Sequence, residues 1–249
     1  MVSTLIKTKN KQGEFLSGIL EGDSKNIIIL CHGSRGSKDA KLLKYLSGGL
    51  SSDFSVFRFD FSGNGDSEGL LENSTYLKDV SDLDVIVDYF LSEGYNVLSI
   101  VGHSKGGSDV FLYVKKYPEK VKSIVAFAPR FNLLESQEYV KFQDCKDEVR
   151  KNGFYFYEGS KNHKITKKYL KELEDISNVG KSFTVNHPTL IVHGSHDEVI
   201  PHSDSEEFVL KNPLVRLDII HEENHGFEKS IHHDFVRNNL RDWLKELEE

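Results

Sequence analysis

Residues 97–107 read VLSIVGHSKGG, a run of apolar and β-branched residues that passes directly into a glycine-flanked serine, Ser104. The run has the composition of a buried strand, and a helical pattern follows it as far as about Tyr117. A G-x-S-x-G pattern between a strand and a helix is typical of a tight turn that exposes the serine hydroxyl. Gly102 and Gly106 suit this turn because a Cβ atom would collide with neighbouring elements. We expect Ser104 to be a nucleophile; a plain glycine-serine loop is the alternative.

Short apolar runs like this one recur along the chain and alternate with longer stretches of helical spacing. The predicted strands are Asn26–Cys31, Val56–Asp60, Val97–Val101, Val121–Ala128, Leu190–His193 and Val215–Ile220. Continuous apolar runs suit a sheet that is covered on both faces. Together with short connections they predict α/β architecture, with right-handed crossovers and a mostly parallel sheet. The segments near Leu5 and Phe15–Leu20 predict an antiparallel pair at its edge.

Two stretches show apolar residues at helical spacing. The first runs from Leu77 to Leu91, with Asp79, Asp82 and Asp88 on its other faces. The second runs from Val236 to Leu247 at the C-terminus. Both are predicted to be helices that pack on the sheet.

The chain has 249 residues and a formal net charge of −7. This length suits one α/β domain over residues 1–249, and no repeat or linker divides it. The negative charge argues against a nucleic-acid partner, which needs a basic surface. No segment approaches a membrane helix or a signal peptide, and two distant cysteines, Cys31 and Cys145, favour a reduced compartment. We expect a cytoplasmic protein with neither membrane nor nucleic-acid partners; the sequence gives no indication of oligomeric state.

Residues 131–186 interrupt the alternation of strands and helices. They contain no run typical of a buried strand, but they include the aromatic run Phe154–Tyr157 and a charged helical pattern from Ile165 to Ile176. Long insertions in compact domains are often lids. We expect this insertion to form a cap over one end of the sheet; a surface excursion without a role is the alternative.

A serine nucleophile needs a base, and the base needs an acid to orient it. In a sheet of this kind the acid follows a later strand than the serine, and the histidine follows the last strand. Asp197 lies in the loop after Leu190–His193, where ligand sites of open α/β sheets are found. Asp197 is therefore the predicted acid. Glu198 is the competing carboxylate, and we expect it to point elsewhere.

The predicted base is His225, in the sequence ENHGF that follows the last predicted strand. His221 is its rival, but it belongs to the strand end. His232 and His233 lie in the following helical pattern and are expected at the surface. His103 directly precedes the serine, and the turn should direct it away from Ser104, so we interpret it as a packing residue.

The remaining histidines do not indicate a metal site. His193, His196 and His202 lie close together in the sequence, but their spacing matches no metalloprotease signature. We therefore expect no metal and no cofactor.

The first buried strand, Asn26–Cys31, ends in the sequence HGSRG. Acyl transfer needs two N–H donors directed at the developing oxyanion. We expect one from the backbone of Lys105, which follows the nucleophile, and one from the backbone of Ser34 in this loop. A glycine-rich phosphate cradle is the alternative, but the P-loop lysine pattern is absent.

With its motifs HGSRG, FDFSGNGDSEG, GHSKGG, HGSHDEVIP and NHGF, the chain resembles the α/β-hydrolase superfamily over nearly its whole length. It is most similar to small cytosolic esterases of the cinnamoyl/feruloyl type and to related serine-aminopeptidase-like or monoacylglycerol-lipase-like hydrolases. The resemblance implies an α/β-hydrolase fold, with a mostly parallel eight-stranded sheet, helices on both faces and a cap insertion. It also implies that the loop Asp60–Ser67 is mainly structural and lies near the oxyanion side.

These observations predict a serine esterase that cleaves carboxylic esters through an acyl-enzyme on Ser104. We expect small or aromatic acyl groups, with Phe154, Tyr155, Phe156 and Tyr157 as possible lining of the substrate pocket. Packing within the cap is the alternative role for this run. An acyltransferase or peptidase could use the same three residues, and a non-catalytic binding protein could keep the fold.

Overall fold

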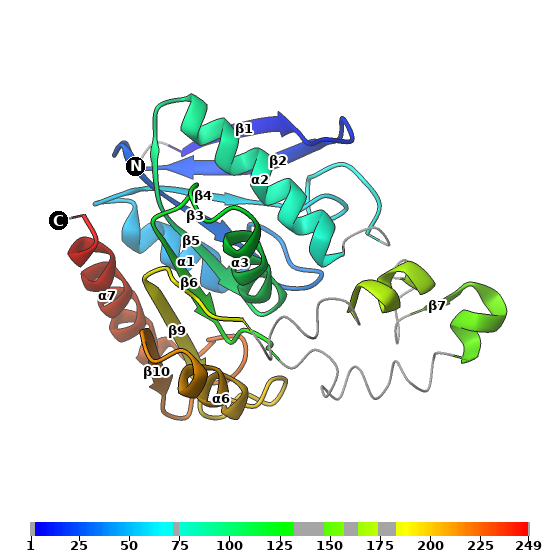
Figure 1. Ribbon diagram of the computed structural model, residues 1–249. Coiled ribbons are helices and arrows are strands. Elements are labelled where there is room, and N and C mark those ends of the chain that lie inside the picture. The colour runs from blue at the N-terminus through cyan, green and yellow to red at the C-terminus, as the bar shows by residue number, and fades with distance from the viewer. Residues whose placement is uncertain (1–2, 72–74, 132–146, 157–163, 174–182, 249) are drawn as a thin grey trace.

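A single eight-stranded sheet forms the centre of the protein, with the strand order β1-β2-β4-β3-β5-β6-β9-β10. The computed structural model describes residues 3–71, 75–131, 147–156, 164–173 and 183–248 (Figure 1). The strands are β1 (Ser3–Lys9), β2 (Phe15–Glu21), β3 (Asn26–Cys31), β4 (Ser55–Phe59), β5 (Asn96–His103), β6 (Ser123–Phe127), β9 (Thr189–Gly194) and β10 (Val215–Ile220). β2 pairs antiparallel with β1 and β4, and all other neighbours are parallel. The predicted fold, including its antiparallel edge pair, is confirmed.

Helices cover both faces of the sheet because its central strands carry apolar residues on both faces. Successive side chains of a strand point to opposite faces, and Ile27 and Ile29 of β3 accordingly join one core cluster while Ile28 and Leu30 join the other. The first cluster also holds residues of α2 (Tyr76–Ser92), α3 (Lys105–Lys116) and α6 (Ser203–Lys211). The second holds residues of α1 (Lys41–Leu50) and α7 (Ser230–Glu246).

The prediction that one apolar face of α2 packs on the sheet from Leu77 to Leu91 is wrong at the two ends of the helix. Leu77 and Leu91 are exposed, whereas Asp79 and Asp82, placed by the sequence on other faces of the helix, are buried. Asp79 forms a buried ion pair with Lys105 of α3, and Asp82 accepts hydrogen bonds from a side-chain amide and a backbone N–H. Burial of these carboxylates is tolerated because each has such partners.

The described part of the insertion lies on the side of the molecule opposite the two chain ends (Figure 1). It contains helical residues 147–152 and 167–173 and a small antiparallel sheet of β7 (Phe154–Phe156) and β8 (Lys164–Thr166). The helical pattern expected from Ile165 is confirmed over residues 167–173, but its start is wrong, since Ile165 lies in β8. Strands of three residues are too short to show a period of two in the sequence. Tyr157 lies outside the described residues, and the extent of the cap stays a prediction.

None of the helices in the described ranges combines the length and the apolar character needed to cross a membrane.

Candidate active site

Ser104 occupies a strained turn between β5 and α3. Its φ of 54° and ψ of −118° lie in a region that residues other than glycine rarely adopt. A Cβ atom at Gly106 would lie 2.5 Å from the His32 carbonyl oxygen, and one at Gly102 would overlap the Gly106 backbone. The backbone N–H of Ser104 donates to the carbonyl of Phe127 at 2.8 Å. The glycines and this hydrogen bond hold the turn at the carboxyl end of the sheet.

Three side chains from distant segments form a continuous chain of hydrogen bonds at this turn. The Ser104 hydroxyl lies 3.0 Å from His225 Nε2, and His225 Nδ1 lies 2.8 Å from Asp197 Oδ2. An ionised carboxylate only accepts, so His225 carries its proton on Nδ1 and its Nε2 accepts from the serine hydroxyl. The structure thus brings together the three residues that the sequence singles out as nucleophile, base and acid.

The carboxylate of Asp197 is fully enclosed, with its side chain 0% exposed. Its Oδ1 accepts from the backbone N–H groups of Val199 and Ile200, both at 2.8 Å. Its Oδ2 accepts from His225 and from a second imidazole, His193 Nε2, at 3.2 Å. Burial opposes ionisation, but the hydrogen bonds from His193, His225 and Ile200 outweigh it and hold the pKa of Asp197 well below its usual range.

His193 is a neighbour of the acid that the sequence interpretation misses. Its spacing of four residues from Asp197, at the end of a buried strand, is the signal that could have indicated the contact. Metal-binding clusters of His, Cys, Asp or Glu are not found among the residues that the structure describes.

The loop that carries His225 is held by a buried carboxylate, Glu223. Glu223 accepts from two backbone N–H groups of the loop and from His232 Nδ1 at 2.7 Å. His233 Nε2 donates to the Phe227 carbonyl at 3.0 Å. The expectation that His232 and His233 are surface residues is therefore wrong: both are half-buried and fix this loop.

The rival residues take other positions. His103 Nε2 donates to the backbone carbonyl of His225 at 2.8 Å, so this histidine packs beneath the loop. The exposed carboxylate of Glu198 accepts a long hydrogen bond of 3.5 Å from the backbone N–H of His225 and makes none to its ring. His221 directly follows β10 and is exposed.

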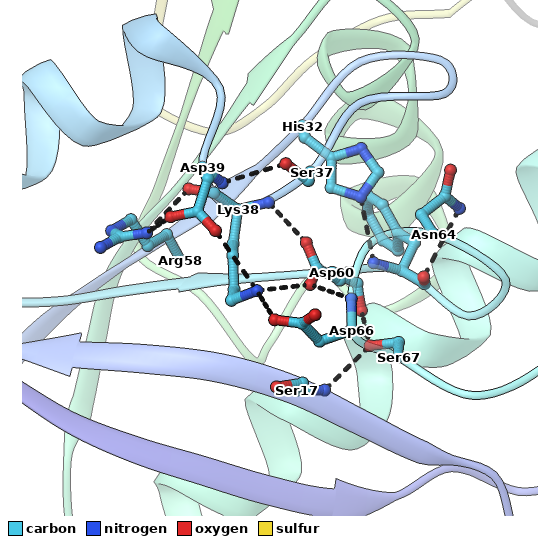
Figure 2. Close-up of polar contacts among 11 residues, drawn as sticks. Ser17, His32, Ser37, Lys38, Asp39, Arg58, Asp60, Asn64, Asp66 and Ser67 are labelled. Carbon is cyan, nitrogen blue, oxygen red and sulfur yellow. Dashed lines mark hydrogen bonds and ion pairs between the residues drawn. The ribbon is translucent and has the colours of Figure 1, made fainter.

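The loop after β3 is clamped to the loop after β4 by a buried lysine, Lys38 (Figure 2). Its backbone N–H donates to Asp60 Oδ1 at 2.6 Å, and its ammonium lies 2.9 Å from Asp60 Oδ2 and 2.5 Å from Asp66 Oδ2. Burial works against the charge of Lys38, but the hydrogen bonds to Asp66 and Asp60 raise its pKa above the usual value. Arg58 supports the same loop through Asp39, at 2.8 Å.

A second contact pins the start of the same loop. The backbone N–H of Phe61 donates to His32 Nε2 at 3.1 Å, while His32 Nδ1 donates to the Gly33 carbonyl at 2.7 Å. Ser34 lies between this contact and the lysine clamp. Within the described ranges, the backbone N–H groups of Ser34 and Lys105 form no hydrogen bond, and their role as oxyanion donors stays a prediction.

With this geometry in place, comparison with known proteins gives the family. The profile described as serine aminopeptidase, S33 matches residues 22–152. The chain belongs to this family. A bovine relative, named palmitoyl-protein thioesterase ABHD10, mitochondrial, is 28% identical over 209 residues, which cover 82% of this chain and 67% of the relative.

Solved structures share the fold of this S33-family chain. The mouse alpha/beta hydrolase domain-containing protein 10 superposes with a TM-score of 0.83 at 21% identity, covering 98% of this chain and 99% of the other. Est1E from Butyrivibrio proteoclasticus with bound ferulic acid superposes with a TM-score of 0.78 at 20% identity, covering 97% and 98%. The predicted α/β-hydrolase fold is confirmed, and so is the prediction of a hydrolase.

The side chain of Lys105, next to the nucleophile, ties α3 of this family member to α2. Its ammonium is buried against Asp79 and lies 5.1 Å from the ring centre of Tyr76. Burial works against its charge, but Asp79 foremost raises the pKa of Lys105 above the usual value. Glu172, from the insertion, accepts from the backbone N–H of Leu77 in the first turn of α2 at 2.8 Å. The insertion is thus hydrogen-bonded to α2, the helix that also carries the partner of Lys105.

The aromatic run proposed as pocket lining divides between two environments. Phe154 and Phe156 are 36% and 42% exposed, whereas Tyr155 packs against a small apolar cluster formed by Tyr76 of α2 and residues of the insertion. No contact in the described part of the chain joins these three residues to Ser104. Their role in the pocket stays a prediction.

Because two histidines, the buried His32 and the half-buried His103, have lowered pKa values, we expect this S33-family member to lose stability in mild acid. Burial lowers the pKa of His32 and of His103 to about 4, against about 6.5 in an unfolded chain. As the pH falls from 6.5 to 4, the two imidazoles become protonated in the unfolded chain but stay neutral in the folded chain. The free energy of unfolding should therefore fall by up to about 2.7 kcal/mol per pH unit near pH 5.

Urea unfolding at pH 7, 6 and 5 measures this slope. The variant His103→Gln keeps a donor for the His225 carbonyl but cannot titrate, so it should lose about half of the slope. An unchanged slope in this variant contradicts the prediction.

Proposed function

We propose that the chain is a serine hydrolase that cleaves carboxylic esters through an acyl-enzyme on Ser104. The observation that carries this proposal is the chain of hydrogen bonds from Ser104 Oγ through His225 to Asp197, at 3.0 and 2.8 Å. A serine hydroxyl is a weak nucleophile until a base takes its proton, and this arrangement supplies the base in the required tautomer.

The proposed reaction uses each of these groups in turn. Ser104 Oγ attacks the ester carbonyl carbon while its proton passes to His225 Nε2, and the buried carboxylate of Asp197 stabilises the imidazolium that forms. The backbone N–H groups of Ser34 and Lys105 receive the oxyanion. Collapse of the tetrahedral adduct breaks the C–O bond of the ester, and the alcohol leaves with the proton from Nε2. Water then cleaves the acyl-serine by the same steps in reverse order.

The substrates we propose are small-molecule esters with small or aromatic acyl groups. The solved structure of Est1E with ferulic acid supports the aromatic acyl group. A second candidate, hydrolysis of a long-chain acyl thioester, is favoured by the bovine relative named a palmitoyl-protein thioesterase. Both candidates pass through the same acyl-enzyme. A cytoplasmic location stays a prediction from the sequence.

A panel of substrates combined with an active-site probe tests the proposal. We expect acetyl, butyryl and feruloyl esters to be hydrolysed with higher kcat/KM than octanoyl esters or palmitoyl thioesters. A fluorophosphonate probe should label the folded protein at Ser104, identified by peptide mass spectrometry. Preference for octanoyl or longer chains overturns the proposed acyl group, whereas absence of labelling and of any hydrolysis overturns the proposed mechanism.

A further inference from the structure

One carboxylate oxygen of Asp197, the acid of the site, accepts hydrogen bonds from two imidazoles. His225 Nδ1 and His193 Nε2 lie 2.8 and 3.2 Å from Asp197 Oδ2. The other oxygen, Oδ1, already accepts from the backbone N–H groups of Val199 and Ile200. These two backbone donors hold the carboxylate in its loop, so the hydrogen bond from His193 acts on the oxygen that faces His225.

The orientation of His193 is fixed by its own partners. Its side chain is 0% exposed, and Nε2 also lies 3.0 Å from the Ile200 carbonyl oxygen. Carboxylate and carbonyl oxygens only accept, so the proton resides on Nε2. Nδ1 then accepts from the Ser205 hydroxyl at 2.8 Å. With both nitrogens satisfied in one tautomer, His193 directs a fixed N–H at Asp197.

We propose that His193 is a positioning residue: its Nε2–H holds the Asp197 carboxylate in register with His225 and limits how strongly that carboxylate attracts a proton. This inference rests on the proposed function of Ser104, His225 and Asp197. A hydrogen bond donated to a carboxylate stabilises its charge and so makes it less basic. Removing the donor should leave Oδ2 more basic and less well oriented.

Few other charged or titratable groups face this pair in the described structure. His103 lies beneath the His225 loop, and its pKa of about 4 keeps it neutral at working pH. Glu198 is exposed and contacts only the backbone N–H of His225. Both groups stay the same when His193 is replaced, so a change in the pH profile reports the contact between His193 and Asp197.

The test compares His193→Leu, which removes the donor, with His193→Gln, whose amide N–H can reach the position of Nε2. We expect His193→Leu to lower kcat on a p-nitrophenyl ester by about 10- to 100-fold, with KM changed less than about threefold, since one hydrogen bond to a charged group is lost. The acid limb of the pH profile of kcat/KM should move upward by roughly 0.5 to 1 pH unit. His193→Gln should restore kcat to within about fivefold of wild type.

His202→Leu is the matched control, because His202 is a partly exposed histidine on the same segment with no contact to Asp197. All variants are assayed below their measured melting temperatures, so that lost stability does not enter the rates. A wild-type pH profile in folded His193→Leu, or an equal shift in His202→Leu, overturns the inference. If wild-type protein itself neither hydrolyses esters nor reacts with the fluorophosphonate, the proposed function has failed instead.

Discussion

Replacing Ser104 with alanine is expected to lower kcat for a p-nitrophenyl ester by about 10⁴- to 10⁶-fold. The hydroxyl oxygen is the atom that forms the acyl-enzyme, and among the described residues no hydroxyl other than that of Ser104, at 3.0 Å, is hydrogen-bonded to His225 Nε2. Residual activity would come from substrate binding and from the two backbone donors of the oxyanion site. KM should change little, since the variant removes a bond formed during the reaction and leaves the binding surface intact.

Ser108→Ala is the control for this experiment. Ser108 lies one turn further along α3 and its hydroxyl donates to the Arg130 carbonyl at 2.9 Å, away from the imidazole. This variant should keep kcat within about threefold of wild type, because it removes only two neutral hydrogen bonds, both to the backbone of Arg130. Stopped-flow assays should also show a burst of p-nitrophenol in wild type and in Ser108→Ala that Ser104→Ala lacks. Equal steady-state rates of ester hydrolysis in Ser104→Ala and wild type would show that Ser104 is not the nucleophile.

The parts of the fold that are predictable from the sequence are those decided by local burial. β3 spans the predicted residues Asn26–Cys31, because a strand covered on both faces reads as an uninterrupted apolar run. β10 also spans its predicted residues, Val215–Ile220, although this edge strand carries Arg216 and Asp218 and is buried only at its two ends. The carboxyl ends of parallel strands meet at one edge of the sheet, so loops far apart in sequence could be expected to share a site.

The polar contacts of the interior could not be predicted in this way. The carboxylate of Asp79 is buried because Lys105 lies opposite it on another helix, and no periodicity within α2 contains that information. The same holds for Glu223, whose partner His232 is supplied by α7, and for Lys38, whose partner Asp60 follows a different strand. In such pairs each buried charge is stabilised by a partner from a distant segment, and the two partners come together only in the folded structure.

Replacing Asp197 with asparagine is expected to lower kcat by about 10⁴-fold, because it should trap His225 in the wrong tautomer. Val199 and Ile200 both donate N–H groups to Oδ1 at 2.8 Å, so the single carbonyl oxygen of the new amide will face them. Its NH₂ group then faces His225 and donates to Nδ1, which places the imidazole proton on Nε2. In that tautomer Nε2 can no longer accept the proton of Ser104.

The neighbouring carboxylate provides the matched control for this variant, measured as kcat and as the rate of fluorophosphonate labelling at one pH. Glu198 is exposed and accepts only a 3.5 Å hydrogen bond from the backbone of His225. Glu198→Gln should therefore keep both rates within about threefold of wild type, because an exposed group contributes little, whereas Asp197→Asn should lose both in parallel. A large loss in Glu198→Gln with an active Asp197→Asn would assign the acid to Glu198 and would leave the buried carboxylate, with its four hydrogen bonds, a structural role alone.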